Sequence, residues 1–260
     1  MTDKAKIKEL AAMLKQSERT CVAIPAISAS NPDLTIPDAY AIQLTNIDLE
    51  LSEGKKITGK KIGLTSLAMQ NLLGVDQPDF GHLLDSMEVQ NHQIKRDTMV
   101  APRVEGEIAF ILKEDIHGPN ATVEDVLNAT DYVVPALEIV DSRLANWKIN
   151  IIDTVSDNAS SGMYELGTQK TDPKKVDLKQ VSMVFYKNGE KVNEGKGTDV
   201  LGDPAYCVAW LANVLHEYGV VLKKGEVVLS GALSAMQAGE AGDSFKAVFS
   251  ELGEIEMKFV

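Results

Sequence analysis

The sequence predicts an α+β protein in which a mixed β-sheet, curled into a roll or sandwich, follows an N-terminal helical region. Helical periodicity is concentrated in residues 1–56, whereas short apolar runs separated by turn signals fill most of residues 57–260. These runs are not each followed by a helix, so a Rossmann fold or a TIM barrel fits poorly. We therefore expect an N-terminal helical region, 1–56, and a β-roll catalytic domain, 57–260, which can also be counted as a single domain, 1–260.

Two helices are predicted in the N-terminal region. Apolar residues recur at helical spacing in the first of them, at Ile7, Leu10, Ala11 and Leu14. The second begins at Thr35, has Pro37 and Asp38 in its first turn, and ends at Gly54. We expect its apolar side to carry Tyr40, Leu44, Ile47 and Leu51.

Residues 57–260 are predicted to be mostly β-structure. The apolar runs are KKIGL, Val104 to Leu112, YVVPALEIV, VSMVFY, EVVLS, FKAVF and EIEMKFV. Asn188-Gly189 lies between two runs and predicts a hairpin with a type I′ turn. One long helix interrupts the strands, with Asp203 as its N-cap, Pro204 at its first position and Gly219 as its stop.

Composition and charge restrict the class of function. With 260 residues, 44% of them hydrophobic and 25% charged, the chain can bury an ample core. The formal net charge of −12 disfavours nucleic acid and anionic membrane as partners. The N-terminus lacks an apolar signal segment, no run approaches the roughly 20 apolar residues of a membrane span, and we expect a cytoplasmic protein. Cys21 and Cys207 form neither a disulfide framework nor a zinc spacing.

Three carboxylates occupy apolar surroundings. Glu105 and Glu107, in APRVEGEIAFIL, share one face of a predicted strand. A half-solvated strand with its acids in water is the simpler explanation for such a pair taken alone. Glu138 stands among apolar neighbours in YVVPALEIV, and three carboxylates without Cys or His suit a hard cation such as Mg²⁺ or Mn²⁺. The alternative for Glu138 is a structural ion pair with Arg103 or Arg143.

Further polar residues could complete a site. Lys60 and Lys61 begin a short strand, and alternation directs them to opposite faces, so at most one should reach a pocket formed by the sheet. Gly74, Pro78 and Gly81 mark a loop that would hold Asp76 and Asp79 at its rim, where Asp79 could equally serve as a turn residue. The segment DNASSG, residues 157–162, is either a polar loop or a set of small donors placed for a carboxylate.

Eight motifs follow one another along nearly the whole chain: GKKIGLTS, QPDFG, PRVEGEIAF, PALEIVDSR, NWKI, DTVSDNASSG, VAWLAN and VVLSGAL. In this order they resemble the 2-keto-4-pentenoate hydratase family of the fumarylacetoacetate hydrolase superfamily. The resemblance implies a mixed β-roll flanked by helices, a Mg²⁺ or Mn²⁺ ion bound by Glu105, Glu107 and Glu138, and homo-oligomers built from dimers. It assigns the catalytic lysine to Lys61, with Lys60 in a variable position.

The activity implied by the resemblance is the metal-dependent addition of water to 2-hydroxypenta-2,4-dienoate (2-oxopent-4-enoate), giving 4-hydroxy-2-oxopentanoate in the meta-cleavage catabolism of aromatic compounds. The ion would act as Lewis acid and template, and Lys61 would exchange protons with the substrate. Asp79 is the candidate for orienting or deprotonating the water. Ser160 and Ser161 are the candidates for hydrogen bonds to the substrate carboxylate.

Alternatives remain within and outside this family. A 4-oxalocrotonate (2-oxohex-3-enedioate) decarboxylase would use a similar ion to stabilise an enolate, and a 2-oxohept-3-ene-1,7-dioate hydratase is a further alternative. QPDFG and NWKI resemble the monoacid hydratases more closely, and the matched motifs hold no extra basic residue for a second carboxylate. A C–C bond hydrolase needs a Glu–His pair to activate water, and the four histidines of the sequence fall in no recognisable pair motif. His82, beside QPDFG, is interpreted as a loop histidine. A non-catalytic binder of 2-oxo acids would have no need of Lys61 and Asp79.

Overall fold

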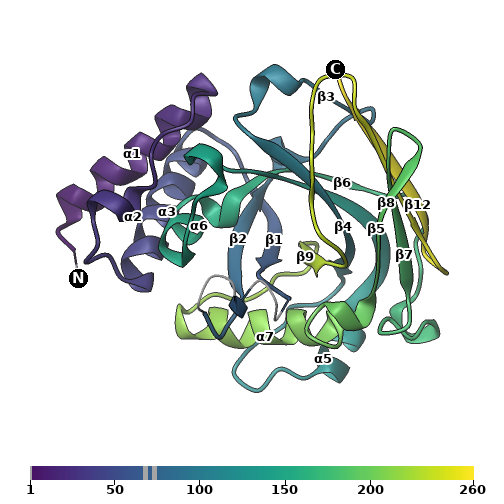
Figure 1. The fold of residues 1–260 in the computed structure, drawn as a ribbon. Helices are drawn as coiled ribbons and strands as arrows, with labels where there is room; N and C mark the ends of the chain where they lie inside the picture. The colour runs from purple at the N-terminus through teal and green to yellow at the C-terminus, as the bar shows by residue number, and fades with distance from the viewer. Residues whose placement is uncertain (1, 67–69, 72–74) are drawn as a thin grey trace.

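The protein consists of two β-sheets that pack together, a group of helices at the N-terminal side, and two further helices across one end of the sheets (Figure 1). The structure is a computed structural model, and it describes residues 2–66, 70–71 and 75–260. Gly74, which we expected in a loop, lies outside the described residues. The α+β class and the mixed sheets with an N-terminal helical region are as the sequence predicted.

Three helices precede the first strand: α1 (Lys4–Thr20), α2 (Ile27–Ser30) and α3 (Ile36–Ser52). Thr35 caps α3 through the predicted capping box with Asp38. The four predicted apolar residues of α1 are all buried. In α3, however, Leu44 and Leu51 are exposed, and the buried side of the helix includes the polar residues Gln43 and Glu50 instead.

The larger sheet holds the strands from which the candidate site is built. Its order is β2-β1-β9-β4-β5-β6, with β10 paired to β4. All neighbours on this path are antiparallel except β1 and β9, which are parallel. The bounds are β1 (Ile57–Gly63), β2 (Asp79–Leu84), β4 (Pro102–Leu112), β5 (Thr130–Asp141), β6 (Ser161–Leu166), β9 (Val227–Ala232) and β10 (Gln237–Ala238).

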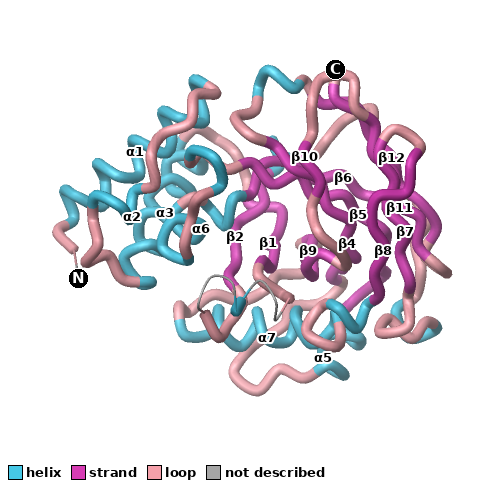
Figure 2. The backbone as a smooth tube through the Cα atoms, in the orientation of Figure 1, coloured by secondary structure: helices cyan, strands magenta, loops and turns pink. Residues whose placement is uncertain are grey.

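The smaller sheet packs against the larger one, as the two sets of strands in Figure 2 show. Its order is β3-β12-β11-β7-β8. Asn188 and Gly189 both have a positive φ, at 53° and 81°, between β7 and β8, which confirms the predicted hairpin. The bounds are β3 (Gln93–Ile94), β7 (Ser182–Lys187), β8 (Glu190–Lys196), β11 (Ser244–Phe249) and β12 (Gly253–Phe259).

The remaining helices are α5 (Val123–Ala129), α6 (Ile151–Ser156) and α7 (Pro204–Glu217). Asp203 caps α7 as predicted, and α7 lies with α5 across the lower end of the sheets in Figure 1. Short 3₁₀ turns occupy Asp85–Met87, Arg96–Thr98, Ala145–Trp147, Asn158–Ser160, Pro173–Lys175 and Gly197–Asp199. Within the described part of the chain, no helix is long and apolar enough to cross a membrane.

The core of the described residues divides into a main cluster that includes the space between the sheets, a cluster around the N-terminal helices, and a third cluster of residues from strands of the larger sheet. The helical cluster contains residues of α1, α2 and α3, and also Leu144 from the loop after β5. Helix α6 packs against α3 and β2, and the 3₁₀ turn Asn158–Ser160 joins it to β6. The proposed division at residue 56 stays a prediction, and the candidate site lies on the larger sheet next to α6.

Candidate active site

Glu105, Glu107 and Glu138 come together on one face of the larger sheet. Glu105 lies directly opposite Glu138 in the antiparallel pair of β4 and β5, and Glu107 follows two residues later on the same face. One carboxylate oxygen from each lies within 4.8 Å of the other two. Glu107 and Glu138 are fully buried and Glu105 is half-buried. We call these three residues the acidic centre.

Most of the buried oxygens of the acidic centre lack hydrogen bonds. Glu107 Oε2 accepts one from the backbone N of Gly231 at 2.8 Å. Glu107 Oε1 and both oxygens of Glu138 accept no hydrogen bond from the described residues. Burial and the neighbouring Glu138 carboxylate raise the pKa of Glu105 to about 8 and that of Glu107 well above its usual value. Three convergent carboxylates with free oxygens, and no sulfur or nitrogen ligand, fit a hard divalent cation.

The alternative ion pairs for Glu138 do not form. Arg143 binds Asp157 instead, and the Arg103 guanidinium stacks over the Trp147 ring with 4.6 Å to its centroid. The cation next to Glu138 is Lys61, whose Nζ lies 3.1 Å from Glu138 Oε1.

Strand β1 presents its two lysines to different surroundings, as alternation predicts. Lys61 is buried among the carboxylates, and its Nζ also donates to the backbone O of Ala159 at 3.1 Å. Burial alone would lower the pKa of Lys61, but Glu138, Asp79 and the other acids outweigh it and raise the pKa. Lys60 faces the other side, 3.6 Å from Glu226, and there burial lowers its pKa.

Asp79 is buried, not exposed at a loop rim as we expected. It is the first residue of β2 and pairs with Gly63 of β1. A Cβ at Gly63 would lie only 2.2 Å from Asp79 Oδ1, so a glycine there is what lets this carboxylate approach Lys61. Thr154 Oγ1 donates to Asp79 Oδ2 at 3.4 Å, whereas Oδ1 has no partner among the described residues. Burial raises the pKa of Asp79.

Residues 157–161 connect α6 to β6 and carry the two candidate serines. Ser160 and Ser161 are both buried, and neither hydroxyl has a hydrogen-bond partner among the described residues. Their surroundings differ. Ser160 follows Ala159, which contacts Lys61. Ser161 instead lines a cavity of about 260 Å³ beside α1 and α3, which we call the second cavity to distinguish it from the larger one described below.

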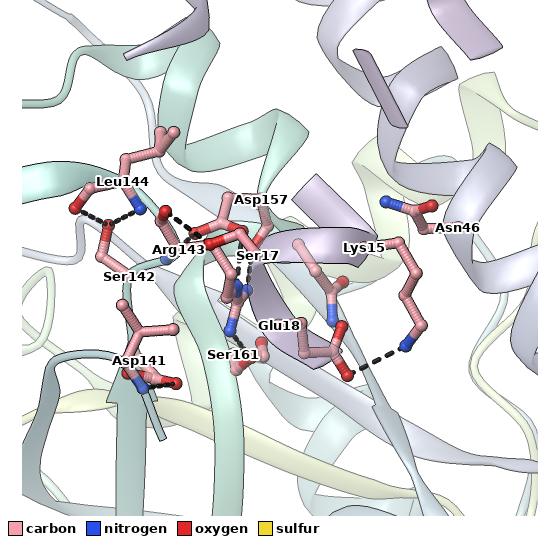
Figure 3. Close-up of polar contacts among 12 residues, drawn as sticks. Lys15, Ser17, Glu18, Asn46, Asp141, Ser142, Arg143, Leu144, Asp157 and Ser161 are labelled. Atoms are coloured by element: carbon pink, nitrogen blue, oxygen red, sulfur yellow. Dashed lines mark hydrogen bonds and ion pairs between the residues drawn. The ribbon is translucent and has the colours of Figure 1, made fainter. Parts of the chain in front are cut away.

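Arg143 holds residues 157–161 from the side of the N-terminal helices (Figure 3). Its Nε donates to Asp157 Oδ1 at 2.5 Å, one terminal nitrogen donates to Ser161 O at 2.8 Å, and the other to Asp157 O. The backbone N of Arg143 donates to Asp157 Oδ2 at 3.0 Å. Its carbonyl accepts from Ser17 Oγ of α1 at 2.9 Å. We call Arg143 and Asp157, with the Ser161 carbonyl, the Arg143 clamp.

His82 is a buried strand residue, which corrects its interpretation as a loop histidine. It lies in β2, and its Nδ1 is 3.0 Å from Gln43 Oε1 of α3. The amide of Gln43 donates to the carbonyls of Phe80 and Val155, so its oxygen is the atom left to accept a proton from the ring. Burial and the nearby charge of Lys60 lower the pKa of His82 to about 3.

A cavity of about 590 Å³ is lined by residues that neighbour those of the site, although none of the three glutamates is among its described lining residues. One lining residue, Thr65, packs against Gly231, whose amide binds Glu107, and another, Pro78, immediately precedes Asp79. Its outer wall includes Tyr206 and Trp210 of α7, with Asp76 and Asp199. Its described lining residues include no lysine or arginine.

Several contributors to the site were not anticipated from the sequence. Gly231, Ala159 and Thr154 act through a backbone amide, a backbone carbonyl and a hydroxyl, which carry no distinctive pattern in a single sequence. Gly231 did offer one signal, because it interrupts the strand run EVVLSGAL, and such a glycine often marks a close approach of the backbone.

Comparisons with known proteins agree with this architecture. Residues 74–260 match the family described as Fumarylacetoacetate (FAA) hydrolase C-terminal. The chain is 44% identical to 2-hydroxyhexa-2,4-dienoate hydratase of Comamonas testosteroni, covering 100% of this chain and 99% of that protein. It is 43% identical to 2-keto-4-pentenoate hydratase of Paraburkholderia xenovorans (strain LB400), covering 97% and 94%. A solved structure of 4-oxalocrotonate decarboxylase from Pseudomonas putida G7, complexed with magnesium and adipate, has a TM-score of 0.97 at 33% identity and covers 100% of this chain and 99% of that one.

Proposed function

Because the chain belongs to the fumarylacetoacetate hydrolase family, we propose that it is a divalent-metal-dependent hydratase that adds water to 2-hydroxypenta-2,4-dienoate, giving 4-hydroxy-2-oxopentanoate. Hydratases of two such dienoates match the chain over nearly its full length, and the product of this reaction fits the catabolism of aromatic compounds by meta cleavage. The observation that carries the proposal is the acidic centre with Lys61 beside it.

Glu105, Glu107 and Glu138 are the proposed ligands of the cation. Glu107 Oε1 and Glu138 Oε2 support this role, because they are buried without a partner among the described residues, and a positive charge would offset their desolvation. When bound, the ion supplies Lewis-acid polarisation of the substrate oxygens and a template for its orientation. A divalent cation fits this donor set, and we propose Mg²⁺ or Mn²⁺.

Lys61 is the proposed proton-transfer residue. Its neighbouring carboxylates keep it protonated, so it can deliver a proton to C5 of the dienol while the 2-hydroxyl loses one. The dienol thereby becomes a 2-oxo-3-enoate, whose C4 is electrophilic. Water then adds at C4 and a proton is delivered to C3. Asp79, with one free carboxylate oxygen beside Lys61, is the proposed residue that orients or deprotonates this water.

Ser160 and Ser161 are the proposed donors to the substrate carboxylate. The unpaired hydroxyl of Ser160, next to the carbonyl that binds Lys61, supports the assignment more strongly than the position of Ser161 in the second cavity. The cavity of about 590 Å³ that Thr65 and Pro78 line supports a monoacid substrate. The described residues that line it include two aspartates and no lysine or arginine, so a second carboxylate on the substrate would be repelled there.

The first test follows 2-hydroxypenta-2,4-dienoate by its ultraviolet absorbance with protein stripped of metal by a chelator, before and after addition of Mg²⁺ or Mn²⁺. We expect loss of the diene only with the cation, and a product heavier by one water in the mass spectrum. Without reaction there, release of CO₂ from 2-oxohex-3-enedioate would make the protein a decarboxylase. Inactivity on both would leave a 2-oxo acid binding protein.

The partner of this protein is accordingly a small 2-oxo or 2-hydroxydienoic acid. The homo-oligomer built from dimers and the cytoplasmic location stay predictions. Sedimentation of the purified protein tests the first of them.

A further inference from the structure

We infer that Asn158 is a positioning residue for Lys61, because its side chain fixes residues 157–161 in the conformation that brings the Ala159 carbonyl to the Lys61 ammonium. The inference rests on the proposed function in that its main consequence is read as a loss of hydration. Three observations carry it: the backbone conformation of the segment, a two-way amide contact with His82, and the position of Lys61 Nζ between two oxygens.

The backbone from Asn158 to Ser160 is left-handed. The φ angles are 55°, 51° and 54° at Asn158, Ala159 and Ser160. Residues with a Cβ avoid this region because of steric conflict with the following carbonyl, and only asparagine among these three tolerates it well. Such a conformation persists only where the surroundings determine it. The contacts of the segment must therefore hold it in place.

Asn158 provides the main contact from within the segment. Its Oδ1 accepts a hydrogen bond from the backbone N of His82 at 2.8 Å, and its Nδ2 donates to the backbone O of His82 at 2.9 Å. The side chain thus pairs with β2 as a neighbouring strand would. A Cβ at Gly81 would lie 2.4 Å from Asn158 O, so this close approach depends on a glycine in β2. The Arg143 clamp holds the flanking residues Asp157 and Ser161.

The consequence reaches Lys61 through one carbonyl. Lys61 Nζ lies 3.1 Å from Ala159 O and 3.1 Å from Glu138 Oε1. A lysine ammonium sits on a flexible four-carbon stem, so attraction to the acids alone would leave its position undefined. The carbonyl supplies a second fixed point. If the segment relaxes, Lys61 keeps its charge and its neighbours but loses its placement relative to the substrate.

The test compares three substitutions of Asn158 with a matched control. Asn158→Ala and Asn158→Gly both remove the amide, and Asn158→Gly also removes the conformational cost of the left-handed backbone. Asn158→Asp keeps the acceptor for the His82 amide and loses the donor. The control is Asn213→Ala, because Asn213 on α7 makes the same two-way contact with the backbone of Ala121, at 2.7 and 3.1 Å, and joins α7 to the loop before α5.

We expect kcat on 2-hydroxypenta-2,4-dienoate to fall by about 10²-fold in Asn158→Ala and Asn158→Gly, as displacements of about 1 Å do elsewhere. Asn158→Asp should lie between these variants and the parent, and Asn213→Ala should keep the parental kcat. The acidic centre lies on β4 and β5, so the Kd for Mn²⁺, from calorimetric titration, should change by less than about twofold.

A readout independent of turnover is amide hydrogen exchange of the cation-free protein. Asn158→Ala should lose protection at His82 and at residues 157–161, while Asn213→Ala loses it only at Ala121 and its neighbours. Full kcat in Asn158→Gly, or unchanged exchange at His82 in Asn158→Ala, would overturn the inference. If the parent protein itself fails to hydrate the dienoate, the proposed function fails, and the exchange comparison alone decides whether Asn158 holds the segment.

Discussion

Buried carboxylates occur in two neighbouring regions of the protein, at the acidic centre and at the Arg143 clamp. At the clamp, both oxygens of Asp157 accept hydrogen bonds from Arg143. At the acidic centre, three buried oxygens of Glu107 and Glu138 accept no hydrogen bond within the described part of the chain, and Lys61 is ion-paired with one of them. Both regions bury charge in the same fold, but only the clamp is complete without a further molecule.

The difference teaches how to separate a structural ion pair from a binding site. Burial of a carboxylate is unfavourable in both regions, and the clamp offsets it internally with a fixed guanidinium. Among the described residues, the acidic centre has only the ammonium of Lys61 for its three carboxylates, and burial together with the neighbouring carboxylates raises the pKa values of Glu105 and Glu107. Carboxyl groups with such raised pKa values are typical of sites where a cation or a reaction requires them.

The largest effect is expected when one carboxylate of the acidic centre is replaced. Glu107→Gln keeps an acceptor for the Gly231 amide and should lower kcat/KM at least about 10³-fold, since a catalytic cation supplies several kcal/mol. The unfolding free energy of the cation-free protein should not fall, because a buried carboxyl group, whose ionised form burial disfavours, is replaced by a neutral amide of the same shape. Absorbance assays and urea unfolding measure both. The exposed Glu194→Gln is the control, and full activity in Glu107→Gln would refute the ligand assignment.

The complementary change removes the cation of the clamp. Arg143→Met leaves Asp157 buried and unpaired, so the free energy of unfolding should fall by about 3–5 kcal/mol. Arg19→Met, which breaks the exposed pair with Glu53, should cost less than about 1 kcal/mol. Urea unfolding compares the two variants. A similar small loss in both would mean that the clamp adds no more stability than a surface ion pair.

Adding a divalent cation should make the two regions alike. At about 100 times its Kd, Mg²⁺ or Mn²⁺ should stabilise the folded protein by about 2.7 kcal/mol and raise Tm by about 5–10 °C. Scanning calorimetry with and without chelator measures this shift. The shift should disappear in Glu138→Gln and persist in Arg143→Met, and an equal shift in Glu138→Gln would place the cation elsewhere.

The smallest predicted effect concerns His82, a histidine whose burial favours the neutral form of the ring. Its pKa is about 3 in the folded protein and 6.5 by default, so below pH 6.5 the unfolded chain takes up a proton that the folded chain does not. The free energy of unfolding should therefore decrease as the pH is lowered, by up to about 2 kcal/mol between pH 7 and pH 5. His82→Gln should flatten this part of the profile in chemical unfolding experiments. The exposed His117→Gln should leave it unchanged.

Local patterns predicted those parts of the site that depend on strand alternation. Glu105 and Glu107 share a face, and Lys60 and Lys61 point to opposite sides, because the side-chain period of a strand is two wherever the strand lies. The hairpin at Asn188-Gly189 was likewise predictable, since its turn needs two residues that accept a positive φ.

The features that alternation could not predict are set by tertiary contacts. Gln43 forms hydrogen bonds with His82 and two backbone carbonyls, so the face of α3 that carries Gln43 is buried. The next residue, Leu44, is therefore exposed. Asp79 is buried because Gly63 leaves room beside it. The left-handed conformation of residues 158–160 is favoured by no sequence propensity of Ala159 or Ser160 and depends on β2 and Arg143.

The position of β9 in the larger sheet has a consequence for biosynthesis. β9 is encoded late in the chain, yet among the described strands it is the one that lies between β1 and β4 and joins them. On the ribosome, β1–β2 and β4–β5–β6 can form as two separate pieces, but the acidic centre can meet Lys61 in its final setting only after residue 232 has emerged. Long-range pairing of this kind is slow. Chains that end before residue 227 lack β9 and should thus be released with an open sheet edge, and chaperones or proteases would meet the face that carries the acidic centre before any substrate does.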